Sequence, residues 1–176
     1  MTTTPDAADS SSPSPDKADP LTPEQHLHLA VALFNRAWEL LETPGRGPDA
    51  DDEMLHTAHA SRLHWAAAGG DAMRLATGEW QCSRVYAELG RAEPATWHAR
   101  RTLAICLANG LGGFLEGAAH EAVARAGLLA GDLDTVRVHL GQARAIAAEV
   151  EDDEDRAILE SDLDELDVEV ARRDTD

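Results

Sequence analysis

The chain is poor in aromatic residues and in cysteine, and it has no long hydrophobic run. Only 4% of its 176 residues are aromatic, which argues against a core built from β-strands. The two cysteines, Cys82 and Cys106, form neither a C-x-x-C pair nor a disulfide framework, so we expect reduced thiols packed between helices. No apolar run approaches the ~20 residues of a transmembrane helix, and we expect no secretory signal because the first residues lack an apolar segment.

Positive charge is scarce as well. The 15 basic residues are outnumbered by 33 acidic ones, which gives a net charge of −18. This charge argues against nucleic acid or an anionic membrane as the main partner. Lys17 is the only lysine, and the preference for arginine together with abundant alanine suggests a GC-rich genome. We therefore expect a cytoplasmic bacterial protein that binds neither nucleic acid nor membranes.

Helical periodicity is the main pattern that the sequence does contain. Residues 1–20 hold four of the eight prolines and almost no large apolar residue, which predicts a disordered tail. Thr22, Pro23 and Gln25 then form a capping-box pattern, and apolar residues recur on one helical face. Turn residues predict six further helices, which extend from about 51 to 69, 71 to 90, 92 to 109, 113 to 130, 133 to 150 and 153 to 172.

A repeat of helical hairpins becomes visible when Gly90 is aligned with Gly131, about 40 residues further on. The segment 80–106 resembles a tetratricopeptide repeat, because Tyr86 lies at its aromatic position, Gly90 at its turn glycine and Ala95 at its small interhelical position. The usual Leu-Gly pair and closing proline are replaced, and the period is longer than the usual ~34 residues.

Periodicity and resemblance together predict an all-α fold. We expect about seven antiparallel helices stacked as helix hairpins, in the manner of a TPR-like α-solenoid, in a single domain over residues 21–173. The helix at 153–172 has an acidic outer face, and we expect it to cap the C-terminal end of the array.

The tetratricopeptide resemblance implies a concave face lined by the first helix of each pair. It assigns Thr77, Trp80 and Arg84 to one such helix, and Glu121 and Arg125 to the next. Tryptophan beside arginine is typical of a binding hot spot, and two arginines can take a carboxylate or a phosphate. The resemblance thus implies a non-enzymatic adaptor or regulatory module whose partner is a protein or peptide, with an anionic group as one option.

Ion pairs within the chain are the alternative role for these charges. Arg84 and Arg125 can pair with Glu88 and Glu121 instead of a ligand. In antiparallel neighbours the index sum of facing residues is nearly constant, and this rule predicts a polar belt at one height of the array. The belt forms either interhelical salt bridges or a pocket, and it comprises Arg62, Glu79, Trp80, Arg101, His120 and Glu121.

Metal binding is the rival function. His56, His59 and His64 lie in one predicted helix, and with Glu79 as a supporting carboxylate they suit a transition metal such as zinc or iron. Otherwise these histidines are packing residues and no cofactor is expected. Glu53 and His56 match one Glu-x-x-His motif, but the di-iron pattern needs a second copy.

No catalytic motif is present in the sequence. There is no nucleotide-binding glycine loop and no H-E-x-x-H motif, so we predict no catalytic residue and leave enzymatic activity open. A homodimer formed through an apolar stripe of the first or last helix is a further interpretation, and it does not depend on the repeat.

Overall fold

The computed structural model describes residues 20–173 and 175, and within them it contains seven helices and no strand. The predicted disordered tail, except for Pro20, lies outside the described residues. The prediction of an all-α array of seven helices is confirmed. The helices are α1 (Pro23–Leu41), α2 (Pro48–Ala67), α3 (Ala72–Glu88), α4 (Ala92–Asn109), α5 (Phe114–Ala130), α6 (Leu133–Ala147) and α7 (Asp153–Arg173).

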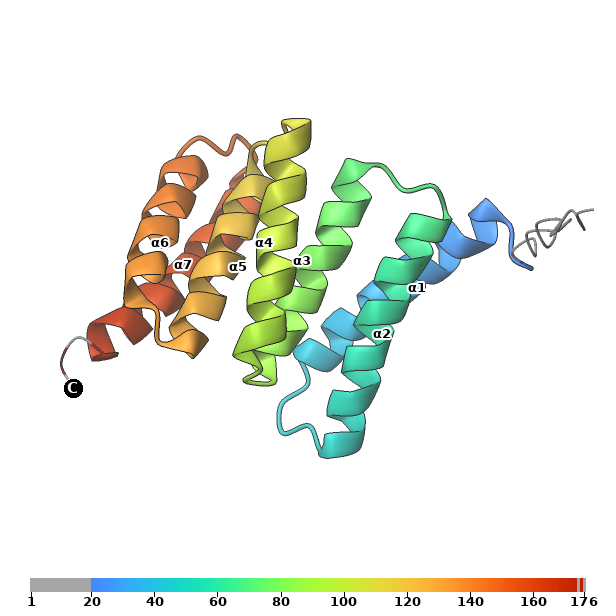
Figure 1. Ribbon diagram of the computed structural model, residues 1–176, viewed down its shortest axis with the longest axis horizontal. Coiled ribbons are helices and arrows are strands. Elements are labelled where there is room, and N and C mark those ends of the chain that lie inside the picture. Colours follow the sequence, from blue (N-terminus) through green and yellow to red (C-terminus); the bar gives the residue numbers. More distant parts are fainter. Residues whose placement is uncertain (1–19, 174, 176) are drawn as a thin grey trace, which may run out of the picture.

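The helices are arranged in two layers, and consecutive helices run antiparallel (Figure 1). Each helix packs against the next one in the sequence. Helices α1, α3, α5 and α7 also pack against one another in that order. Among the described residues the backbones of α2, α4 and α6 do not approach one another, although side chains of α2 and α4 meet at His59 and His98. We call the first set the odd layer and the second the even layer. Helix α7 ends the array by packing against both α5 and α6.

Local sequence explains where the helices begin and end. The Gln25 amide N–H donates to the Thr22 hydroxyl at 3.3 Å, and the Thr22 N–H donates to the Gln25 side chain at 2.8 Å, so the predicted capping box is formed. Helix α2 begins at Pro48, slightly before its predicted start, because proline suits the first helical position and Gly47 precedes it. Gly131 ends α5 in the left-handed conformation, with φ of 76°.

Helix α5 lies at the centre of the packing and contacts α3, α4, α6 and α7. It is rich in alanine and glycine, so its neighbours approach closely. A Cβ atom added at Gly117 would lie 2.5 Å from Leu159 Cδ2 of α7 and 3.3 Å from Ile146 Cγ2. Glycine at this position therefore allows the close contact between α5 and the C-terminal helix.

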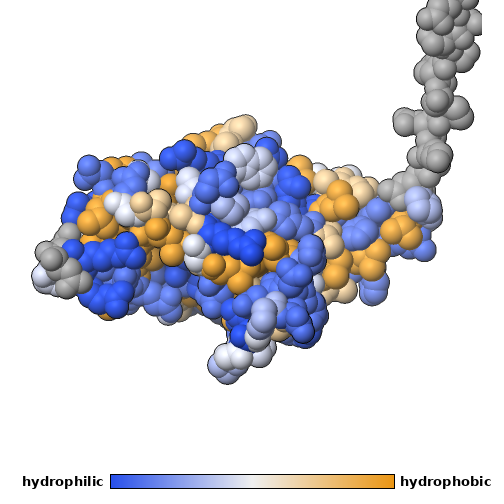
Figure 2. Space-filling view, turned by 60° about the horizontal axis from the view of Figure 1, so that its bottom comes forward, coloured by the Kyte–Doolittle hydropathy of each residue, from blue (hydrophilic) through white to orange (hydrophobic). Residues whose placement is uncertain are grey.

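Two apolar clusters hold the ends of the array. The C-terminal cluster joins α5, α6 and α7 and is centred on Leu159, Leu163 and Leu166, whereas the N-terminal cluster joins α1, α2 and α3 around Met54 and Val85. On the face in Figure 2, hydrophobic side chains form several patches that are separated by hydrophilic ones. None of the described helices is both long enough and apolar enough to cross a bilayer.

Candidate functional site

The odd layer carries a row of aromatic side chains across three helices. The ring of Trp38 on α1 lies 6.2 Å from Phe34 and 5.3 Å from Trp80 on α3, and Trp80 lies 6.0 Å from Phe114 on α5. All four residues are half-buried. Thr77 is on the same helix as Trp80, but its hydroxyl donates to the Met73 carbonyl within that helix. The row thus binds the odd layer together and leaves only part of each ring accessible.

The predicted arginines of the concave face are paired within the chain. The Arg84 guanidinium lies 3.5 Å from Glu121 and 3.1 Å from Asp162 of α7, and Arg125 donates to the same two carboxylates. The side chains of Arg84 and Arg125 are 22% and 19% exposed, and that of Glu121 only 2%. This arrangement matches the internal ion-pair interpretation, with Asp162 in the place predicted for Glu88.

A second charged cluster lies on the other side of α3. Glu79 is 2% exposed and joins three helices. Its Oε1 accepts from the Nε atoms of Arg62 of α2 and Arg101 of α4 at 2.7 and 2.9 Å, and its Oε2 lies 2.6 Å from Nδ1 of His98 of α4. Burial alone would raise the pKa of Glu79, but the hydrogen bonds from His98, Arg62 and Arg101 outweigh it and lower the pKa to about 2.

The predicted belt is therefore divided into separate clusters. Arg62, Glu79 and Arg101 meet as predicted, and they form interhelical ion pairs. His120 instead lies against His139 of α6, with 2.8 Å between their Nδ1 atoms. Burial and the contact with His139 lower the pKa of His120, and burial together with the charge of Arg100 lowers the pKa of His139.

A buried thiol and two imidazoles meet between α2, α3 and α4. Cys82 Sγ, one nitrogen of His59 and one nitrogen of His98 all lie within 4.8 Å of one another. The His59 Nε2 atom is 2.8 Å from the Tyr86 hydroxyl, and Tyr86 stacks on the His98 ring. Burial raises the pKa of the Cys82 thiol, and the nearby Glu79 carboxylate adds to this, so that it reaches about 12.

The predicted histidine group of α2 does not converge. His56 is exposed and lies 3.8 Å from Asp52, whereas His64 Nδ1 is 2.7 Å from Nδ1 of His26 on α1. Of the three, only His59 joins a group that could hold a metal ion in the part of the chain described, and Glu79 supports His98 in that group. His59 and His64 are five residues apart and therefore point about 140° away from each other, because each residue adds about 100° of rotation.

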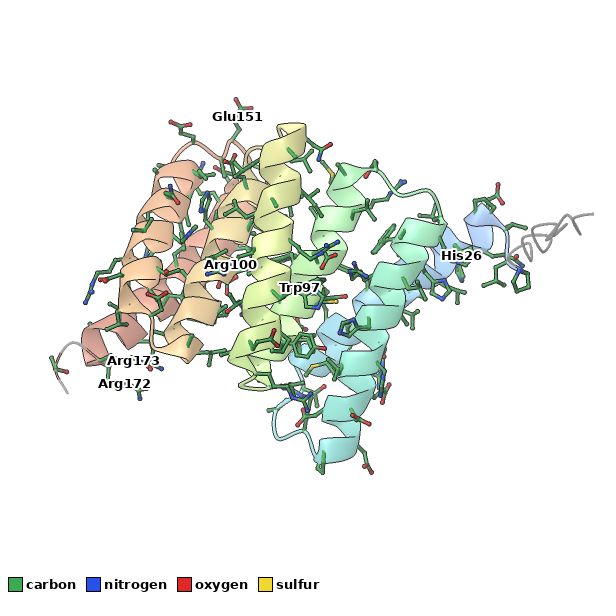
Figure 3. The ribbon with its side chains drawn as sticks, viewed as in Figure 1. His26, Trp97, Arg100, Glu151, Arg172 and Arg173 are labelled. Carbon is green, nitrogen blue, oxygen red and sulfur yellow. The ribbon has the colours of Figure 1, made fainter. Side chains whose placement is uncertain are left out.

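The even layer presents an exposed aromatic side chain that the repeat alignment did not select. Trp97 of α4 is 49% exposed, and the Arg101 guanidinium carbon lies 4.7 Å from the centre of its ring. Figure 3 shows Trp97 and Arg100 near the middle of the array. Ligand pockets typically have volumes of about 300–1,000 Å³, and the hollow beside Trp97 has a volume of 600 Å³. Its lining consists of Ala92, Glu93, Thr96, Trp97, Arg100, Arg101, Ala104 and Ala130.

Arg100 adds a positive charge to this hollow, and it also lies close enough to the Asp132 carboxylate to help lower the pKa of that group. It is exposed, and no ion pair to it is present among the residues that the structure describes. Arg101, by contrast, is shared between Trp97 and Glu79. We call Trp97, Arg100 and Arg101 with the adjoining hollow the α4 surface. The sequence shows that Trp97 and Arg100 are close in the chain, but only the structure shows that both side chains are exposed.

Comparison with known proteins adds no relative. No family model matches the chain, and no significant similarity to a curated protein or to a solved structure is found.

Proposed function

We propose that the protein is a non-enzymatic binding module that holds a segment of a partner protein on the α4 surface. The observation that carries this proposal is that a half-exposed Trp97 and an exposed Arg100, which forms no close ion pair among the described residues, both line a hollow of 600 Å³ with a mainly apolar lining. Tryptophan and arginine dominate binding energy at protein interfaces.

The chemistry of the surface defines the partner segment. An apolar side chain fits the hollow, and a carboxylate on the same segment fits Arg100, because a guanidinium binds carboxylates through two parallel hydrogen bonds. The surrounding net charge of −18 repels acidic partners at long range. We therefore propose a short peptide with one acidic group beside an apolar side chain, rather than a long acidic tract.

The concave face is the second place for such a partner, in keeping with the TPR-like architecture that we propose for the array. Its support is weaker, because Arg84 and Arg125 are already neutralised by Glu121 and Asp162. An incoming carboxylate would have to displace these internal partners. Trp80 could still contribute an apolar contact to a partner on this face.

Selection of random peptides on the immobilised full chain tests the proposal. We expect the selected peptides to share an acidic residue next to an apolar one, and Trp97→Ala and Arg100→Gln to weaken their binding about 10–100-fold each. Leu107→Ala and Arg91→Gln are the matched controls, because both residues are exposed and lie on or beside α4 outside the hollow.

Two outcomes would contradict the assignment. If Trp80→Ala and Arg84→Gln abolish binding while Trp97→Ala and Arg100→Gln do not, the partner lies on the concave face. If no selected peptide binds the unaltered chain more tightly than it binds the Trp97→Ala variant, the proposal of a peptide-binding α4 surface is wrong. Far-UV circular dichroism of each variant establishes that the helical array is retained.

A further inference from the structure

One ligand-bearing side chain from each of three consecutive helices meets at a single buried point. His59 belongs to α2, Cys82 to α3 and His98 to α4, and their ligand atoms lie within 4.8 Å of one another. Cys82 and His98 are buried, with exposed fractions of 1% and 5%, and His59 is half-buried. We propose that these three side chains bind one transition-metal ion of the zinc class. This proposal does not rest on the proposed peptide-binding function.

The separation of the ligand atoms is close to what such an ion needs. Bond lengths of about 2.3 Å to sulfur and about 2.0 Å to nitrogen put ligand atoms about 3.3–3.8 Å apart around a zinc ion. Side-chain rotations that move each atom by less than about 1 Å close the remaining gap, and they need no movement of the helices. The half-buried His59 provides the side from which an ion enters.

The hydrogen bonds around the group orient it as they do around known metal ligands. His98 Nδ1 is bonded to Glu79 Oε2 at 2.6 Å, which leaves Nε2 of that ring as the metal ligand. A carboxylate that fixes the tautomer and orientation of a ligating histidine is a general feature of metal sites. Glu79 is therefore a positioning residue. His59 is held in the same way, because its Nε2 meets the Tyr86 hydroxyl at 2.8 Å.

The donor set selects the type of ion. One thiolate and two imidazoles suit zinc, cobalt or copper, and they disfavour magnesium and calcium, which prefer oxygen ligands. Binding exchanges the proton of Cys82 for the ion, and the proton leaves to the solvent. Three protein ligands leave one coordination position for water or another small ligand. The ion adds charge near Arg62 and Arg101, but their side chains are 31% and 46% exposed, so solvent screens part of the repulsion.

Cobalt titration of the chelator-treated full chain tests this site. We expect one equivalent of Co²⁺ to bind and to produce the near-ultraviolet charge-transfer absorption of a cobalt–thiolate bond, with visible bands of four-coordinate cobalt. Cys82→Ser should remove the charge-transfer band, and His59→Gln should weaken binding by at least about 10–100-fold. Excess Zn²⁺ should displace the cobalt and bleach both sets of bands.

Two variants serve as matched controls. Cys106→Ser removes the other thiol, which is buried in a separate apolar cluster, and His56→Gln removes an exposed histidine of the same helix as His59. Both should bind Co²⁺ like the unaltered chain. The proposal is overturned if no thiolate band appears, or if Cys106→Ser loses it. The measurement on Cys106→Ser does not depend on whether Cys82→Ser folds, because Cys106→Ser retains all three proposed ligands.

Discussion

Replacement of Glu79 by glutamine removes the charge that joins α2, α3 and α4 and leaves the shape of the side chain nearly unchanged. The carboxylate is 2% exposed and meets Arg62, Arg101 and His98 at 2.6–2.9 Å. Loss of one partner of a buried ion pair typically costs about 3–5 kcal/mol, and the partial exposure of both arginines reduces this. The lowered pKa of Glu79, about 2 against an ordinary 4.5, corresponds to about 3 kcal/mol. We expect Glu79→Gln to lower the free energy of unfolding by about 3 kcal/mol.

Urea unfolding of the metal-free chain measures this effect. With an m-value of about 2 kcal/mol/M, a loss of about 3 kcal/mol lowers the urea midpoint by about 1.5 M. The matched control is Glu53→Gln, because Glu53 also forms an interhelical pair, with Arg36, but both side chains are nearly half exposed. We expect a change below about 1 kcal/mol there. Equal changes in the two variants would refute the claim that burial makes the Glu79 cluster the stronger one.

Three further predictions concern stability. The free energy of unfolding should decrease as the pH falls from about 7 to about 5. Burial lowers the pKa of His120 and His139 below 6.5, so the unfolded chain takes up protons before the folded chain does. Urea titrations at the two pH values should show a smaller decrease for His139→Gln. Arg46→Ala should lower the free energy of unfolding, measured by thermal unfolding, by about 2 kcal/mol. The side chain of Arg46 is 9% exposed, donates to three carbonyls at the end of α1 and pairs with two carboxylates. Arg46→Lys should recover only part of this loss. Leu163→Ala, at a fully buried site of α7, should cost about 2–5 kcal/mol, and a thermal midpoint equal to that of the surface variant Val168→Ala would contradict this.

The helices were predictable because their ends are marked by local chemistry. The capping box at Thr22 and the glycine at 131 act within a few residues, so no knowledge of the packing is needed. The start of α2 was the exception. The prediction placed it near residue 51, but Gly47 and Pro48 already satisfy the requirements of a helix start. Seven helices joined by short turns then have to pack as antiparallel neighbours.

The candidate sites were less predictable, because index sums give the height of a residue on a helix but not its direction. They placed Arg62 near Glu79, which the structure confirms. Applied to Cys82, the same rule gives Ala99 as the facing residue on α4, whereas the structure places His98 within 4.8 Å of that thiol. A shift of one residue along a helix is a rotation of about 100°, which is enough to exchange a packing alanine for the histidine of the proposed metal site.

Contacts between helices that are distant in the sequence could not be predicted from the index sums of consecutive helices. Asp162 on α7 pairs with both Arg84 on α3 and Arg125 on α5. The index sum relates only consecutive helices, so it could not place α7 against α3. These contacts neutralise the arginines that the repeat resemblance assigned to a ligand, and the exposed pair Trp97 and Arg100 lies in the other layer.

The α4 surface and the proposed metal site share side chains, although one is exposed and the other buried. Arg101 lies over the Trp97 ring and also donates to Glu79, and the His98 ring is 4.7 Å from that of Trp97. Glu79 in turn orients His98. A partner that draws Arg101 away from Glu79 therefore changes the support of a metal ligand, and by thermodynamic linkage a bound metal changes the affinity for that partner by the same factor. Trp97, His98 and Arg101 lie on α4, and Glu79 of α3 joins Arg101 to His98, so these two helices connect the two proposed sites.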